Sequence, residues 1–161
     1  MQDLETRLSE QDPDILRLWL RWMTCTNLLT STLRARFKEE HQTTVPRFDL
    51  LIQLEPHQDG LGAQELARRL MVTPGNITVI TDQLAQEGLV VRSTPPADRR
   101  SVHIQLTEKG REHLKAMTSS YQSWLSELFS GLSAEEHGVL LSLLARLKGS
   151  LLEGMESRND T

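Results

Sequence analysis

The feature that most constrains this chain is a pair of short helical segments that almost touch. Residues 64–70 and 74–87 carry apolar residues at helical spacing, and only residues 71–73 separate them. Thr73 can accept a hydrogen bond at the start of the second segment, and Pro74 suits its first position, where a missing N–H is harmless. So short a connection predicts two helices at a steep angle, which is a helix-turn-helix.

Two strand-forming runs follow the second helix. Residues 89–91 and 102–106 are rich in β-branched and alternating apolar side chains, and prolines interrupt the segment between them. The same segment carries Asp98, Arg99 and Arg100. We therefore expect a two-stranded hairpin with an arginine-bearing loop, the arrangement called a wing.

Further helices are expected on both sides of this motif. Apolar residues at helical spacing cover residues 12–40 and 45–55, while Pro, Asp and Gly mark residues 56–62 as a loop. The hairpin is followed by two more long helices. Thr107 can cap the first of them, and residues 133–136 form the capping box of the second.

The first helix and the last two carry more Leu, Trp and Phe than a domain of 161 residues can bury by itself. A two-fold dimer is the simplest way to cover such a surface. The sequence therefore predicts a mainly α fold with a small β-wing. An N-terminal dimerisation helix (residues 12–44), a winged helix-turn-helix lobe (residues 45–107) and C-terminal dimerisation helices (residues 108–155) follow one another in it.

Composition narrows the classes of function. The chain is 38% hydrophobic and 25% charged, which suits a protein that builds a core. No apolar run is long enough for a bilayer, and the polar, acidic start lacks a signal-peptide pattern, so we expect a cytoplasmic protein without a membrane partner. The net charge of −4 gives no global attraction for nucleic acid, so any basic patch must be local. Fourteen of the 18 basic residues are arginine, the side chain suited to bidentate contacts with phosphate and guanine.

Catalytic and metal chemistry is not indicated. Cys25 is the only cysteine, so it allows no internal disulfide, and we interpret it as a small hydrophobe rather than a redox sensor. The five histidines show no ligand spacing. No nucleophile with its base, carboxylate pair or phosphate loop is recognisable. We expect a protein that is not an enzyme and needs no cofactor or metal.

The stretch from residue 47 to residue 111 resembles the MarR family of bacterial transcription regulators, and the flanking helices match that family's layout over nearly the whole chain. Its most specific part is the wing with the start of the following helix, which consists of Asp98, Arg99, Arg100, Val102, Ile104, Leu106, Thr107, Glu108, Lys109 and Gly110. The resemblance implies a homodimeric repressor that binds double-stranded DNA. Its two recognition helices would enter successive major grooves of a pseudo-palindrome, with half-sites about 10 base pairs apart.

In this interpretation the helix at residues 74–87 lies in the major groove, and its outward polar and apolar side chains read base edges. It contains no Lys or Arg, so arginines outside it are expected to supply most of the affinity. The family resemblance places Arg100 in the minor groove, held by Asp98, whereas an ordinary polar turn is the alternative. The expected DNA-binding set is Gln64, Arg68, Arg69, Thr73, Asn76, Thr78, Val79, Gln83, Arg92, Asp98, Arg99 and Arg100.

Members of the family commonly respond to small aromatic acids or phenolic compounds. The candidates for binding such an effector here are Trp19, Trp22, Asp49 and Arg92. Aromatic residues on a helical stripe can equally be core of a dimer interface, and Asp49 can be solvated or paired with Arg47. A winged-helix adaptor that binds protein and not DNA is the alternative function, favoured by the acidic net charge and the uncharged recognition helix.

Overall fold

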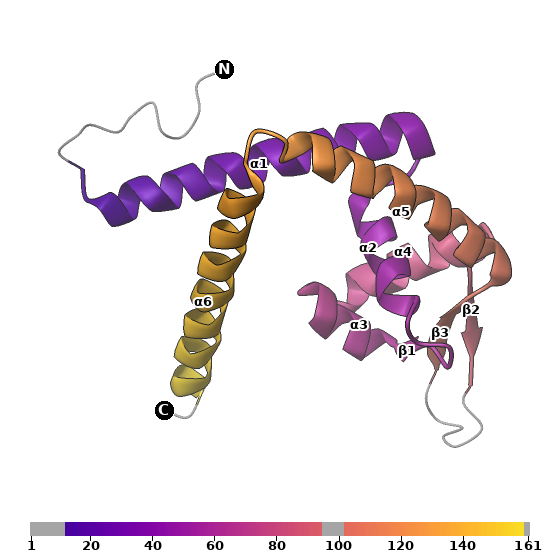
Figure 1. Ribbon diagram of the computed structural model, residues 1–161. Coiled ribbons are helices and arrows are strands. Elements are labelled where there is room, and N and C mark those ends of the chain that lie inside the picture. Colours follow the sequence, from indigo (N-terminus) through magenta and orange to yellow (C-terminus); the bar gives the residue numbers. More distant parts are fainter. Residues whose placement is uncertain (1–11, 95–101, 160–161) are drawn as a thin grey trace. The chain divides into compact units, whose positions relative to one another are not determined.

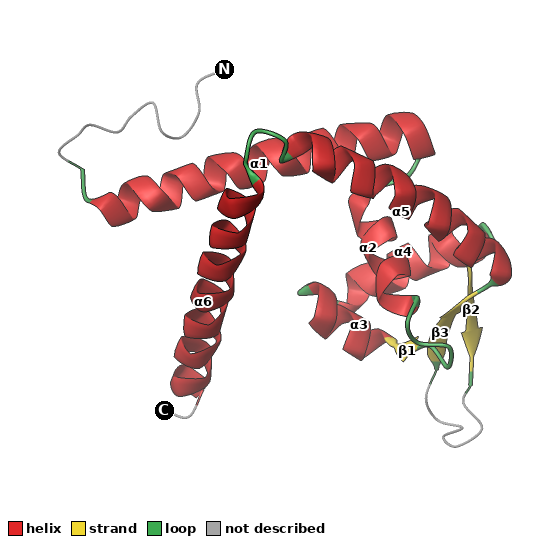
Figure 2. Cartoon of the chain, viewed as in Figure 1, coloured by secondary structure: helices red, strands yellow, loops and turns green. Residues whose placement is uncertain are grey.

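A computed structural model of the chain describes residues 12–94 and 102–159, with side chains to residue 155 (Figures 1 and 2). The order of elements is α1 (Asp14–His41), α2 (Val45–Leu54), β1 (Leu61–Gly62), α3 (Ala63–Leu70), α4 (Pro74–Gln86), β2 (Val90–Ser93), β3 (His103–Leu106), α5 (Glu108–Leu128) and α6 (Ala134–Asn159). The mainly helical fold with a small β-sheet is confirmed. Two compact units divide the chain, Met1–Gln122 and Ser123–Thr161, so their boundary falls inside α5.

The predicted helix-turn-helix is formed by α3 and α4. Met71 takes a left-handed conformation with φ of 54°, which ends α3 and turns the chain sharply. Thr73 then caps α4, because the N–H of Asn76 donates to its Oγ1 at 3.4 Å. Helices α3 and α4 pack against each other, and Ala67 of α3 and Ile77 of α4 are both buried.

The wing belongs to a three-stranded antiparallel sheet in the order β1, β3, β2 (Figure 2). Val90 of β2 pairs with Leu106 of β3, which confirms the predicted hairpin. The prediction of a plain loop at residues 56–62 was wrong, since Leu61 and Gly62 form a strand that pairs with β3. Two residues are too few to show the alternation by which a strand is recognised in sequence.

An aromatic cluster joins three helices of the first unit. Phe37 of α1 lies with its ring centroid 4.7 Å from that of Phe48 of α2 and 5.9 Å from that of Tyr121 of α5. Phe48 and Tyr121 are 4.9 Å apart. Phe37 and Phe48 are almost completely buried, so this cluster fixes the end of α1 against α2 and α5.

Two helices expose apolar stripes. The amino-terminal half of α1 exposes large side chains that include Ile15 at 73% and Trp19 at 57%. In the second unit, Ser133 and Glu136 form the predicted capping box at the start of α6. An exposed stripe then runs along α6 with one member in every turn, formed by Val139, Leu143, Leu147, Leu151 and Met155.

Candidate nucleic-acid interface

One face of α4 is open to solvent and the other is part of the core. Ile77, Thr81 and Leu84 are fully buried, and the Thr81 hydroxyl donates to the carbonyl oxygen of Ile77 at 2.7 Å. Thr78, on the exposed side, donates its hydroxyl to the carbonyl oxygen of Pro74 at 3.2 Å. The exposed residues Asn76, Val79 and Gln83, by contrast, make no side-chain hydrogen bond within the part of the chain that the structure describes. The face therefore offers two amides and an apolar side chain to a partner.

The start of α5 holds the carboxyl end of α4. The ammonium group of Lys109 donates to the carbonyl oxygen of Glu87 at 2.7 Å, where a cation also offsets the partial negative charge of the helix end. Thr107 donates its hydroxyl to the carbonyl oxygen of Gly88 at 2.7 Å and accepts from the N–H of Gly110 at 3.0 Å. A Cβ atom on Gly110 would lie 2.0 Å from the carbonyl oxygen of Leu89. This position therefore needs glycine for the close approach of the two backbones.

A second contact joins the same end of α4 to α2. Arg47 forms an ion pair with Glu87, where an alternative from the sequence paired Arg47 with Asp49. His113 of α5 lies close to this pair. Burial lowers the pKa of His113, and the nearby positive groups of His41 and Arg47 lower it further. The folded structure therefore favours the neutral form of His113.

Arg92 of β2 reaches across to α4. Its Nη2 lies 2.6 Å from Oδ1 of Asp82, and the two side chains are 45% and 48% exposed. Arg92 was predicted as a phosphate contact and as an effector ligand. The structure gives it a partner on α4, where it neutralises Asp82, the only acidic residue of that helix.

The two arginines of α3 share one carboxylate. Glu65 accepts from Arg68 at 2.8 Å and from Arg69 at 2.6 Å, and Arg69 also lies 3.0 Å from Nε2 of His57. Hydrogen bonds from Arg69 and then Arg68 lower the pKa of Glu65. The Arg68 side chain stays 77% exposed, so it remains accessible to a phosphate. The i+3 and i+4 spacing of these arginines from Glu65 was visible in the sequence, and the sequence interpretation missed the pairing.

The remaining residues predicted to contact DNA lie on α3, at the start of α4 and between β2 and β3. Gln64 is exposed on α3, next in the chain to Glu65, and Thr73 is exposed at the start of α4. Asp98, Arg99 and Arg100 lie outside the described residues. Lys109 was noted in the sequence only as part of a motif, because its contact with Glu87 joins residues 22 apart in the chain.

The residues predicted to bind an effector have separate surroundings. Trp19 and Trp22 are 57% and 40% exposed on α1. Asp49 is partly buried, which raises the pKa of its carboxyl group. Burial also raises the pKa of Tyr121, and the charge of Asp49 raises it further. Arg92 is held by Asp82. No hydrogen bond or ion pair between these predicted residues occurs in the described ranges 12–94 and 102–155.

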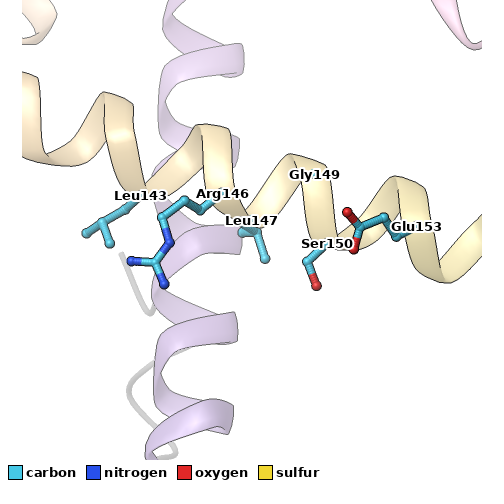
Figure 3. A pocket seen from close by; sticks show the side chains of 6 residues that line it. All are labelled: Leu143, Arg146, Leu147, Gly149, Ser150 and Glu153. Carbon is cyan, nitrogen blue, oxygen red and sulfur yellow. The ribbon is translucent and has the colours of Figure 1, made fainter.

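The cavities of the second unit are grooves on a helix surface. One, of about 570 Å³, is lined by residues of α6 alone, and Figure 3 shows Leu143, Leu147 and Ser150 projecting from the same side of that helix. In this view Arg146 lies between the two leucines, and Glu153 lies beyond Ser150. A groove made by a single helix cannot enclose a small ligand, so it is an exposed helix face.

Two searches of the described residues bear on other functions. None of the helices there is long and apolar enough to cross a membrane. Within the same ranges, no group of three or more His, Cys, Asp or Glu side chains is placed to hold a metal ion.

Known proteins are similar to this chain in sequence and in fold. Residues 43–102 match the MarR family model. An uncharacterized HTH-type transcriptional regulator of Bacillus subtilis (strain 168), YkoM, is 37% identical over 83 residues, which are 52% of this chain and 54% of that protein. The match thus spans about half the length of this curated relative.

Solved structures extend the similarity beyond that segment. Wild-type MarR from E. coli, in its apo form, is 26% identical with a TM-score of 0.68, over 79% of this chain and 94% of that one. FabT of Streptococcus pneumoniae, solved in complex with DNA, is 21% identical with a TM-score of 0.74, over 87% and 99% of the two chains. At that identity the second likeness concerns the fold alone.

Proposed function

We propose that this chain, a member of the MarR family of transcriptional regulators through its domain at residues 43–102, is a homodimer. The dimer binds a pseudo-palindromic DNA operator and represses transcription. The observation that carries the proposal is the exposed face of α4. It is capped, anchored at both ends and free of side-chain hydrogen bonds at Asn76 and Gln83 within the described chain. A helix held in this way fits a major groove.

The dimer is supported by the exposed stripes of α1 and α6. The α6 stripe repeats at four-residue intervals from Val139 to Met155, and its five residues are 47% to 64% exposed. Large contiguous apolar faces of this kind mark interaction surfaces. A second copy supplies an identical stripe, and its two-fold symmetry matches the symmetry of a palindromic operator.

The affinity for DNA is proposed to come mainly from arginines outside α4. Arg68 is well exposed on α3, and the arginines of residues 99–100 belong to the segment between β2 and β3. We expect Arg100→Ala to weaken operator binding and to lower the slope of log affinity against log salt by about one. Titration of a labelled operator at several salt concentrations measures that slope, and an unchanged slope would remove Arg100 from the interface.

A small aromatic or phenolic effector is proposed to release the operator. Trp19 and Trp22 supply aromatic surface, and Asp49 is a partly buried carboxylate next in the chain to Phe48 of the aromatic cluster. An effector that binds one spacing of the two lobes better than another would shift the population of the DNA-binding form. Tryptophan fluorescence and operator affinity are measured across a panel of phenolic acids. No change in either quantity for any compound would refute an effector of this class.

The proposed function is tested by sedimentation and by DNA binding of the purified chain. Sedimentation velocity is expected to show a dimer. Binding to DNA from upstream of its own gene is expected to be specific and to weaken steeply as salt rises. A monomer, or a dimer with no affinity for any duplex at low salt, would refute the proposal, and the second result would favour the protein-interaction adaptor.

A further inference from the structure

We propose that α4 selects half-sites in which the base pairs beneath it are A·T, and that Val79 is the residue that reads a thymine methyl group. This inference rests on the proposed function, because it assigns a base preference to the same helix. It is carried by the residues that α4 exposes and by the contact that engages its only carboxylate.

The exposed side chains that remain available lie on one side of the helix. Asn76, Val79 and Gln83 are separated by three and four residues, the spacing that places side chains above one another on a helix face. Val79 is 58% exposed, although burial is the usual environment of valine. The span from Asn76 to Gln83 is about 10 Å of helix, close to three base-pair steps of about 3.4 Å each. One such helix therefore covers a run of three to four base pairs.

The chemistry of this face matches adenine and thymine. In the major groove an amide side chain pairs with N6 and N7 of adenine, and an apolar side chain contacts the methyl group of thymine. Guanine is usually read by Arg or Lys, and α4 contains neither. Asn76 and Gln83 thus provide the two amides for adenine, and Val79 lies between them for thymine.

The charged route from α4 to a G·C pair is Asp82, because a carboxylate can accept from N4 of cytosine. Oδ1 of Asp82 accepts from Nη2 of Arg92 at 2.6 Å, so the charge of this carboxylate is compensated by Arg92. Thr78 donates its hydroxyl to Pro74 and has no second proton to offer a base. The pairing of Asp82 with Arg92 therefore leaves the neutral face as the reader.

The inference is tested first by selection from a pool of random duplexes with the purified full-length chain. The selected half-site is expected to contain about three consecutive A·T pairs, matching the length of the exposed face. Each thymine of the selected duplex is then replaced by deoxyuridine, which removes only the methyl group. One replacement is expected to weaken binding about fourfold, the effect of losing one buried methyl contact.

The side chain is identified by variants in the same assay. Val79→Ala, which shortens the apolar side chain, is expected to reduce the difference in affinity between the thymine and deoxyuridine duplexes, and Gln83→Ala is expected to lose about tenfold of its preference for A·T over G·C at one position. Val91→Ala is the matched control, because it makes the same substitution at an exposed valine outside α4. Val91 lies on β2, and its side chain is 46% exposed. This variant is expected to keep the full sensitivity to deoxyuridine.

The outcomes separate the two proposals. Enrichment of no duplex at all would overturn the proposed function and this inference with it. Enrichment of half-sites with guanine or cytosine at the positions sensitive to Val79→Ala would leave the proposed function standing and overturn the A·T preference. Equal binding of thymine and deoxyuridine duplexes by the wild-type chain would overturn the role of Val79.

Discussion

Replacement of Gly110 by alanine tests the close approach of α5 to the turn that follows α4. In a helix without neighbours the change stabilises by about 0.8–1 kcal/mol, because alanine is the better helix former. Here the new Cβ would lie 2.0 Å from the carbonyl oxygen of Leu89, and Cβ atoms essentially never come within 3.0 Å of another heavy atom in this way. The oxygen of Leu89 is a backbone atom, and the Cβ is bonded directly to the backbone of residue 110. Neither can rotate away, so α5 and the turn must separate.

The magnitude follows from what that separation breaks. Overpacking costs about 1–3 kcal/mol. The N–H of Thr107 also donates to the same oxygen of Leu89 at 3.1 Å, and a weakened hydrogen bond costs about 1 kcal/mol more. After the gain in helix propensity, Gly110→Ala is expected to lose about 2 kcal/mol, which lowers the melting temperature by about 4–8 °C for a chain of this length.

Thermal unfolding followed by circular dichroism, at a fixed protomer concentration, measures the effect. Gly138→Ala in α6 is the matched control, because nothing lies within 4 Å of the Cβ that it would add. That variant is expected to be as stable as the wild type or slightly more stable. A Gly110→Ala chain that melts at or above the wild-type temperature would refute the close approach.

Three further predictions follow from other contacts. A double-mutant cycle of Asp82→Ala and Arg92→Ala is expected to give a coupling of about 0.5 kcal/mol in urea unfolding, since both side chains are about half exposed; a coupling that persists unchanged in high salt would contradict an exposed ion pair. Because the folded pKa of His113 lies below its ordinary value of 6.5, the unfolded chain takes up a proton that the folded chain resists, so stability is lost as pH falls below 6.5. Between pH 7.5 and pH 5.5 the urea midpoint of His113→Gln is expected to fall less than that of the wild type, because the variant lacks this titrating group. An identical fall in both chains would contradict a lowered pKa of His113 in the folded chain. Leu147→Asp, which changes both copies of the α6 stripe, is expected to weaken the dimer about a hundredfold or more in sedimentation, and an unchanged dimer would place the interface elsewhere.

The sequence by itself determined the helices, the hairpin and the caps at Thr73 and Ser133. Each of these caps joins residues three positions apart, so local spacing is enough to predict them. The helix-turn-helix and the hairpin were predicted from such spacing. They lie within one or two residues of the predicted bounds.

The tertiary structure alone decided which partners these elements meet. Strand β1 exists because β3 lies beside it, about 40 residues further along the chain. The pairing of Arg92 with Asp82 exists because β2 lies next to α4, and the spacing of the two residues in the sequence does not indicate it. The need for glycine at position 110 is explained only by the backbone of Leu89, which lies next to it in the folded chain. Contacts of this kind depend on how the packed core brings distant segments together, and no local pattern encodes that arrangement.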